Sequence, residues 1–139
     1  MRSDRIGLAY IKDAITIAEE ANESLAKGHY HRTVRKCQEA VELGLKGLLR
    51  LVGIEYPKSH RVGPVLLESN LHDDIPRDTL ERMSEISDEL ARERESAFYG
   101  SEEGPAEELF TKVDAEEAIT MAAYTLDVIG GLLKKHNIS

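Results

Sequence analysis

Hydrophobic residues recur along most of the chain at steps of three and four, the spacing that places them on one face of an α-helix. The first such stretch covers residues 3–27, with Ser3 as its N-cap and Gly28 at the position of a left-handed C-terminal stop. Its apolar positions are Leu8, Ile11, Ile15, Ala18, Ala21 and Leu25. We therefore predict a first amphipathic helix over residues 3–27.

A second apolar stretch, residues 30–52, is wider than the first. Its face is formed by Val34, Cys37, Val41, Leu45, Leu48 and Val52, and it is broadened by Ala40, Leu43 and Leu51. Gly53 permits a positive φ and Pro57 prevents further helical hydrogen bonding, so the helix should end there. Such a wide apolar surface predicts the central, most buried helix of the fold.

Two further helices are predicted in the middle of the chain. After a loop over residues 54–61, residues 62–69 carry enough apolar positions for a short connector helix. The next long helix spans residues 76–97, because Pro76 suits a first helical turn. Its stripe consists of Leu80, Met83, Ile86 and Leu90. Residues 100–113 are acidic and contain Gly and Pro, so we expect an exposed, mobile loop there.

The last helix is expected to begin at Asp114, which forms an Asp version of the capping box with Glu117 three residues later. Its apolar positions follow a near-heptad spacing and are Ala115, Ile119, Ala122, Leu126, Ile129 and Leu133. This stripe suits the interior of a bundle or a dimer seam, and periodicity leaves both open. No strand or repeat signal appears. We predict an all-α fold, an antiparallel (up-and-down) four-helix bundle with a short extra connector helix, as one domain over residues 1–139.

Charge and composition exclude some classes of function. The 139 residues contain 18 Lys+Arg and 26 Asp+Glu, and the net charge of −8 argues against a broad basic surface for nucleic acid. Aromatic residues make up 5% and Trp is missing, which argues against a base-stacking platform. The N-terminus lacks a signal-peptide pattern, and no apolar run is long enough for a membrane span. The single Cys37 is expected to be a buried, inert thiol of a reducing compartment, so we expect a cytoplasmic protein.

The common catalytic motifs are absent from the sequence. It has no phosphate-binding Gly-rich loop before Lys-Ser/Thr, no His-Glu-x-x-His, no Cys-x-x-Cys and no Gly-x-Ser-x-Gly. His29 and His31 lie at a predicted helix start, but positions two apart point in different directions, so we interpret them as exposed histidines rather than metal ligands. His72 and His136 are isolated near predicted helix ends. We expect no metal and no cofactor.

Residues 28–67 carry a more distinctive series of motifs. The motifs are Gly28-His-Tyr30, Gln38-Glu-Ala-Val-Glu42, Leu45-Lys-Gly-Leu-Leu49, Pro57-Lys-Ser-His60 and Leu66-Leu67. The series resembles the HEPN family, whose members share a Gly-x-Tyr turn, Gln-(Gln/Glu)-Ala-Val-Glu, Leu-Lys-(Ala/Gly)-Leu-Leu and Pro-Lys-(Ser/Thr)-His before a short Leu-Leu helix. The predicted order of helices extends the resemblance across the chain.

The resemblance implies a small helical bundle, commonly a homodimer, in which a family arginine from each subunit lines a shared cleft. In many members an Arg followed after four to six residues by His forms a metal-independent ribonuclease site. Such members are often toxins paired with a minimal nucleotidyltransferase antitoxin. The chemistry is reasonable, because Arg can hold a phosphate with two hydrogen bonds while His moves protons during attack of a ribose 2′-hydroxyl.

This sequence departs from that pattern at the catalytic histidine. Tyr99 occupies its place, separated by four residues from Arg94 and by six from Arg92, and no other Arg in the chain has a His at this spacing. A second set of HEPN proteins carries Arg-x-x-Ala-Asp-Tyr here, which Arg94, Ala97 and Tyr99 match, with Phe98 replacing the acid. In that set a ribonuclease role is less secure. At most we expect a weak metal-independent endoribonuclease.

Two hypotheses of different classes follow. In the first, the chain is a nucleotide- or RNA-binding homodimer that works beside a nucleotidyltransferase in a toxin–antitoxin-like pair, with Arg94 and Tyr99 as candidate catalytic residues. Its candidate ligand-binding residues are Arg92, Lys46 and His60. In the second, the chain is a non-catalytic interaction protein that holds a partner in a groove beside its last two long helices. The acidic residues 102–108 then favour a basic partner.

Each candidate residue also has a purely structural explanation. Arg94 could interact with the negative end of the helix dipole, and Tyr99 could be a packing residue with its hydroxyl in water. Lys46 and Glu42 are four apart on a predicted helix, so they could form an ordinary surface ion pair. His60 could brace its loop by a hydrogen bond. The sequence leaves these explanations open beside the functional ones.

Overall fold

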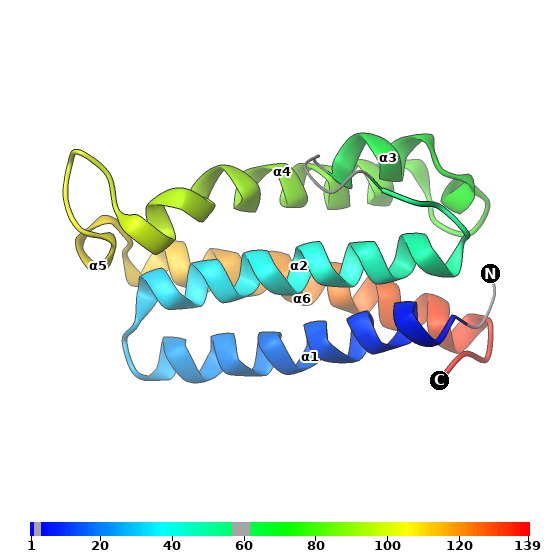
Figure 1. Ribbon diagram of the computed structural model, residues 1–139, viewed down its shortest axis with the longest axis horizontal. Helices are drawn as coiled ribbons and strands as arrows, with labels where there is room; N and C mark the ends of the chain where they lie inside the picture. Colours follow the sequence, from blue (N-terminus) through cyan, green and yellow to red (C-terminus); the bar gives the residue numbers. More distant parts are fainter. Residues whose placement is uncertain (2–3, 57–61) are drawn as a thin grey trace.

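The prediction of an all-α, up-and-down bundle is confirmed. A computed structural model describes residues 1, 4–56 and 62–139, and the regular elements in that part of the chain are helices. The long helices run side by side with alternating direction, and both termini lie at the same end of the bundle (Figure 1). In chain order the elements are α1 (Arg5–Ala26), α2 (Tyr30–Leu51), α3 (Val62–Glu68), the 3₁₀ turn η1 (Asn70–Asp73), α4 (Arg77–Tyr99), α5 (Ala106–Leu109) and α6 (Lys112–Lys135).

Helix α2 is the central helix, as its wide apolar face predicts. It packs against α1, α4 and α6, and its predicted face is buried except at Val52, which is partly buried, as is the broadening residue Leu43. Cys37 is fully buried and free, and burial raises the pKa of its thiol to about 12. The thiol is therefore protonated and unreactive at neutral pH.

Helix α1 meets α2 at a crossing where the two backbones touch. A Cβ atom placed on Gly47 would lie 2.7 Å from the carbonyl oxygen of Gly7, and one placed on Gly7 would lie 2.9 Å from that of Gly47. Three of the five buried residues of α1 are Gly or Ala, among them the fully buried Ala14. The prediction that Ile15 belongs to this buried face is wrong, because this residue is 46% exposed.

The apolar stripe of α6 packs inside the bundle, against α2 and α1. Ala115, Ala122 and Ile129 are buried, and Leu126 is partly buried against the core. The periodicity left open whether these residues face the interior of a bundle or a dimer seam. In the structure they pack in the interior of the bundle. In the described part of the chain, no helix is long and apolar enough to cross a membrane.

The helix starts differ in part from those predicted. Helix α1 is capped by Asp4, whose Oδ1 accepts a hydrogen bond from the Gly7 N–H at 2.8 Å, while the predicted cap Ser3 lies outside the described residues.

The predicted start of the last helix at Asp114 is wrong. Thr111 is the N-cap, because its Oγ1 accepts from the Asp114 N–H at 3.2 Å and Asp114 Oδ2 accepts from the Thr111 N–H at 2.8 Å. These two hydrogen bonds satisfy backbone N–H groups at the start of the helix. The capping box is therefore formed by Thr111 with Asp114, and not by Asp114 with Glu117.

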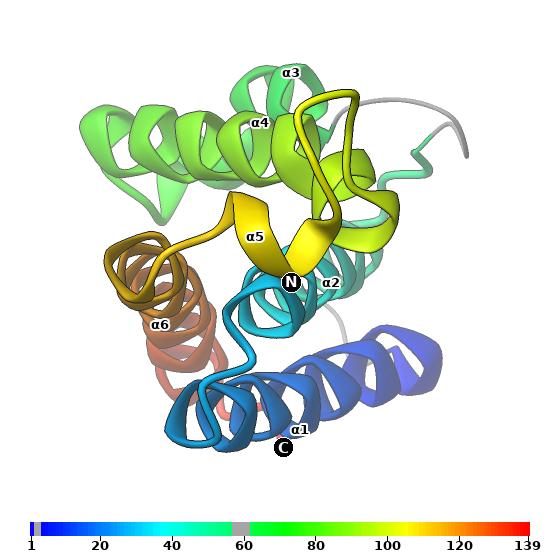
Figure 2. The ribbon, with the colours of Figure 1, turned by 90° about the vertical axis from the view of Figure 1, so that its left-hand side faces the viewer.

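The segment that precedes α6 is more ordered than predicted. Residues 106–109 form the single turn α5, which lies across the end of the bundle and contacts both α4 and α2 (Figure 2). Gly100 ends α4 with φ of +76°, and a Cβ there would lie 2.5 Å from the Gly104 carbonyl oxygen. This tight turn directs the acidic segment back over the start of α2.

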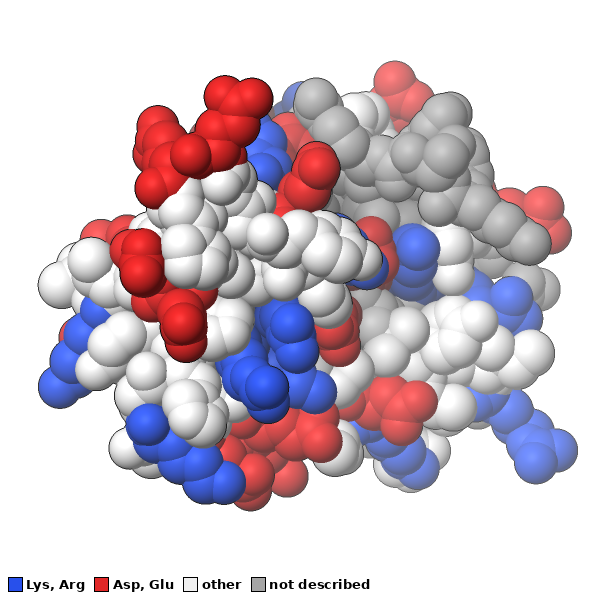
Figure 3. All heavy atoms as spheres, turned by 60° about the vertical axis from the view of Figure 1, so that its left-hand side comes forward, with Lys and Arg blue, Asp and Glu red and all other residues white. Residues whose placement is uncertain are grey.

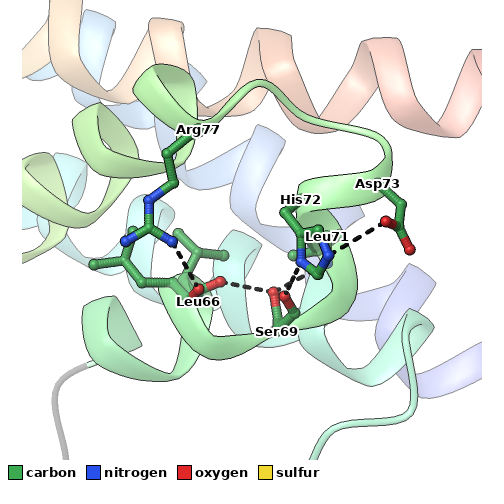
Figure 4. Close-up of polar contacts among 7 residues, drawn as sticks. Leu66, Ser69, Leu71, His72, Asp73 and Arg77 are labelled. Carbon is green, nitrogen blue, oxygen red and sulfur yellow. Dashed lines mark hydrogen bonds and ion pairs between the residues drawn. The ribbon is translucent and has the colours of Figure 1, made fainter.

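The junction between α3 and α4 is held by a compact set of hydrogen bonds (Figure 4). The Ser69 hydroxyl donates to the Leu66 carbonyl at 2.6 Å and accepts from the Leu71 N–H at 3.2 Å. The His72 ring nitrogen Nδ1 lies 3.0 Å from the Ser69 carbonyl oxygen, and Arg77 donates to a backbone carbonyl of α3 at 3.3 Å. His72 therefore has a structural role at this turn.

The crossing of α1 and α2 gives a direct test of the fold. Replacing Gly47 with Ala should destabilise the protein by about 2 kcal/mol, because the new methyl group meets backbone that cannot move aside. The free energy of unfolding measured in urea checks this expectation.

Gly130 provides the matched control, since a methyl group there meets no described atom within 4 Å. Gly130→Ala should be neutral or stabilising by roughly 0.5–1 kcal/mol, as expected for an exposed helical position. Equal effects of the two substitutions would contradict the close crossing.

Candidate functional site

The candidate site lies where the last two turns of α4 pass over the first half of α2. Arg94 projects from α4 and donates from Nη1 to Gln38 Oε1 of α2 at 2.8 Å. Gln38 is buried, with 3% of its surface exposed, whereas Arg94 remains exposed. A buried amide thus holds an exposed guanidinium in a defined position.

An aromatic ring one turn after Arg94 organises the site further. The Phe98 ring centre lies 5.2 Å from the Arg94 guanidinium carbon and 4.5 Å from that of Arg35, which comes from α2. Each cation is attracted to the negative face of the ring, an interaction worth roughly 0.5–1 kcal/mol at exposed sites. Phe98 therefore brings two positive charges from different helices to one place.

A pocket open to solvent adjoins this pair. It has a volume of about 330 Å³ and is lined by Ala91, Arg94, Glu95, Phe98 and Tyr99. The Tyr99 ring contacts the Phe98 ring with centres 5.9 Å apart, and the Tyr99 residue is 84% exposed. The structure thus brings the predicted residues Arg94 and Tyr99 to the wall of one pocket.

His31 lies one helical turn before Arg35 on α2. It is half-buried rather than exposed as predicted, and its pKa is lowered by burial, by Arg35 and by Arg32, against the opposing effect of Glu107 in α5. His31 therefore stays largely neutral at neutral pH. Basic side chains gather in the middle of this end of the molecule, with acidic side chains above and below them (Figure 3).

Two other predicted ligand-binding residues, Lys46 and Arg92, do not line the pocket. Lys46 is 3.9 Å from Glu42 and 4.9 Å from the centre of the Tyr56 ring, so the predicted surface ion pair is present. Lys46 comes eight residues after Gln38, roughly 12 Å farther along the helix axis. Arg92 is exposed and is not among the lining residues. His60, with the rest of its Pro-Lys-Ser-His motif, lies outside the described residues.

Sequence reasoning did not identify Arg35, Gln38 or Phe98 as site residues. Arg35 and Gln38 are three residues apart, so they lie on the same side of α2. This spacing is the only sign in the sequence that the two side chains could belong to one site. Their relation to Arg94 depends on how α4 rests on α2. In residues 1, 4–56 and 62–139, no group of three or more His, Cys, Asp or Glu residues is arranged to hold a metal ion.

A second groove lies between α4 and α6 and has the opposite charge. Its volume is about 450 Å³, and it is lined by Arg82, Glu89, Val113, Glu116, Glu117, Thr120 and Met121. Near it, burial raises the pKa of the Glu93 carboxyl, and the carboxylates of Glu89, Asp114 and Glu117 raise it further. The repulsion among these carboxylates shows that the groove concentrates negative charge.

Comparisons with known proteins agree with this architecture. A family model described as HEPN domain matches residues 8–132. The crystal structure of TT1696 from Thermus thermophilus is similar, with a TM-score of 0.71 and 25% identity over 92% of this chain and 98% of that chain. The structure of ST0689, described as an archaeal HEPN homologue, has a TM-score of 0.70 and 28% identity over 94% of this chain and 99% of that chain. No curated protein sequence matches significantly.

The contact between Arg94 and Gln38 can be tested by a double-mutant cycle. Arg94→Ala and Gln38→Leu should be coupled by roughly 1 kcal/mol in the free energy of unfolding, because each removes the same charged hydrogen bond. Arg82→Ala combined with Gln38→Leu is the control and should be additive, since Arg82 pairs with Glu85 instead. Additivity in both cycles would show that Arg94 is not held by Gln38.

Proposed function

The chain belongs to the HEPN domain family, and from this premise we propose that it is a nucleotide- or RNA-binding module in which Arg94 holds a phosphate group. One observation carries the proposal. Arg94 is fixed by a buried amide at 2.8 Å at the wall of an open pocket, yet in the described part of the chain no carboxylate forms an ion pair with it. Its remaining N–H groups are free to bind an anion from solution.

The chemistry of the lining residues suits a nucleotide. A guanidinium presents several donors in one plane and matches two phosphate oxygens at once. The exposed Tyr99 ring offers a face on which a base can stack. Because Tyr99 stands where the ribonucleases of the family carry His, we propose binding as the main function and at most weak, metal-independent RNA cleavage.

The assembly that we propose follows the family. The chain would act as a homodimer, in which two copies of Arg94 face a shared cleft and double the positive charge there. It would work beside a minimal nucleotidyltransferase as its partner in a toxin–antitoxin-like pair. The high exposure of Tyr99 at the end of α4 supports an interface on this side of the molecule.

A binding titration tests the role of Arg94. The unaltered protein should bind ATP or a short RNA oligonucleotide, and Arg94→Ala should weaken that binding about tenfold or more, since a charged hydrogen-bond pair to phosphate is lost. Arg82→Ala, on the same helix but paired with Glu85, is the control and should bind normally. Equal affinity of the Arg94→Ala variant, with its fold intact, would refute the proposal.

The acidic groove between α4 and α6 favours a second candidate function, that of a non-catalytic interaction protein with a basic partner. Carboxylates of Glu89, Glu116 and Glu117 line the groove beside the apolar Val113 and Met121. A basic protein segment complements this charge.

Co-purification from the native host separates the two functions. The double substitution Glu116→Gln and Glu117→Gln should release a partner that the unaltered chain retains at low salt, and Arg94→Ala should leave retention unchanged. Release by Arg94→Ala alone would count against the groove and for the arginine site.

A further inference from the structure

We propose, building on the proposed function, that Arg35 of α2 is a second phosphate-binding residue, and that Arg35 and Arg94 together take the terminal phosphate of a free nucleotide rather than the internal phosphates of an RNA chain. The candidate residues named from the sequence do not include Arg35. The position of Arg35 became apparent from the packing of α4 on α2.

The two positive charges lie at the same aromatic ring. Both guanidinium carbons are near the same Phe98 ring centre, at 4.5 Å for Arg35 and 5.2 Å for Arg94. Their separation therefore cannot exceed these two distances combined. A single phosphate group with its oxygens spread around phosphorus can be approached by both arginines when their flexible side chains adjust.

Neither charge is neutralised by a carboxylate in the described part of the chain. Three other arginines of this acidic protein have carboxylate partners, at 3.3 Å for Arg50, 3.1 Å for Arg77 and 3.5 Å for Arg82, whereas Arg5, Arg32 and Arg92 have none among the described residues. Within the described residues, Arg35 and Arg94 have none, although the chain contains 26 Asp and Glu residues. Two neighbouring positive charges without a counter-charge favour a ligand with two negative charges, and a terminal phosphate is such a ligand at neutral pH.

The acidic surroundings of the pair favour a free nucleotide over an RNA chain. Glu95 lines the pocket, and Glu102, Glu103, Glu107 and Glu108 lie in the segment that follows α4. At this end of the molecule, acidic side chains lie above and below the basic ones (Figure 3). An RNA chain carries a negative charge at every nucleotide and would bring further phosphates against these carboxylates. A free nucleotide carries its charge at one end and avoids this repulsion.

The size and polarity of the pocket also suit one nucleotide. Its volume of about 330 Å³ is at the lower end of small-molecule sites. The Phe98 ring is occupied by the two guanidinium groups, which leaves the Tyr99 ring for the base. Half-buried His31, one turn before Arg35, adds a neutral hydrogen-bonding group beside the pair.

Isothermal titration with AMP, adenosine and an RNA 12-mer with hydroxyl groups at both ends tests the inference. The unaltered protein should bind AMP more tightly than either of the other two probes. Arg35→Ala should weaken AMP binding about tenfold or more, the loss expected for a charged hydrogen-bond pair. Arg35→Lys, which keeps the charge but not the two-pronged geometry, should show an intermediate loss and should keep the fold intact.

Arg32→Ala is the matched control, since it removes one charge from the same helix without touching the Phe98 ring. It should change AMP affinity by less than about threefold, as expected for a screened surface charge. Equal losses in Arg32→Ala and Arg35→Ala, or tighter binding of the RNA 12-mer than of AMP, would overturn the inference. If the RNA binds through Arg94 while Arg35→Ala has no effect, the proposed function survives and this inference fails. If no probe binds the unaltered protein, both fail.

Discussion

The burial of α2 determines how the other long helices pack and where the side chains of the candidate site stand. The helix contacts α1, α4 and α6 at once, and its backbone touches that of α1 at Gly47. Once α2 is fixed in this way, Gln38 has almost no access to water and must find a partner among neighbouring polar groups. Arg94 supplies that partner at 2.8 Å, so the packing of the core also determines where the guanidinium stands.

The same packing explains why the aromatic residue at position 98 matters. In the HEPN pattern that this stretch resembles, an acid stands at this position, and this chain has Phe98 in its place. Phe98 instead attracts Arg94 and Arg35 to its ring and leaves hydrogen-bond donors of both available to a ligand. Phe98 thus gathers two arginines that have no carboxylate partner among the described residues, in a chain whose net charge is −8.

The sequence predicted the long helices well, because their apolar periodicity depends on burial of one face and needs no knowledge of the partner helix. It failed where close contacts decide the outcome. Ile15 was misplaced because its neighbour Ala14 is the residue that faces α2 and is buried, and α5 was missed because a single turn has no periodicity. Motif resemblance found Arg94 and Tyr99. Arg35 could not be found from sequence, since its contact with Phe98 depends on the register between α2 and α4.

The proposed function requires that an uncompensated arginine site at the crossing of α4 and α2 binds a phosphate group. Nuclear magnetic resonance of the arginine side-chain Nε–H groups during titration with AMP tests this requirement most directly. The signals of Arg94 and Arg35 should shift together and reach saturation, while that of Arg82 stays in place. Signals that do not move, or that all move alike without saturation, would contradict phosphate binding at this site.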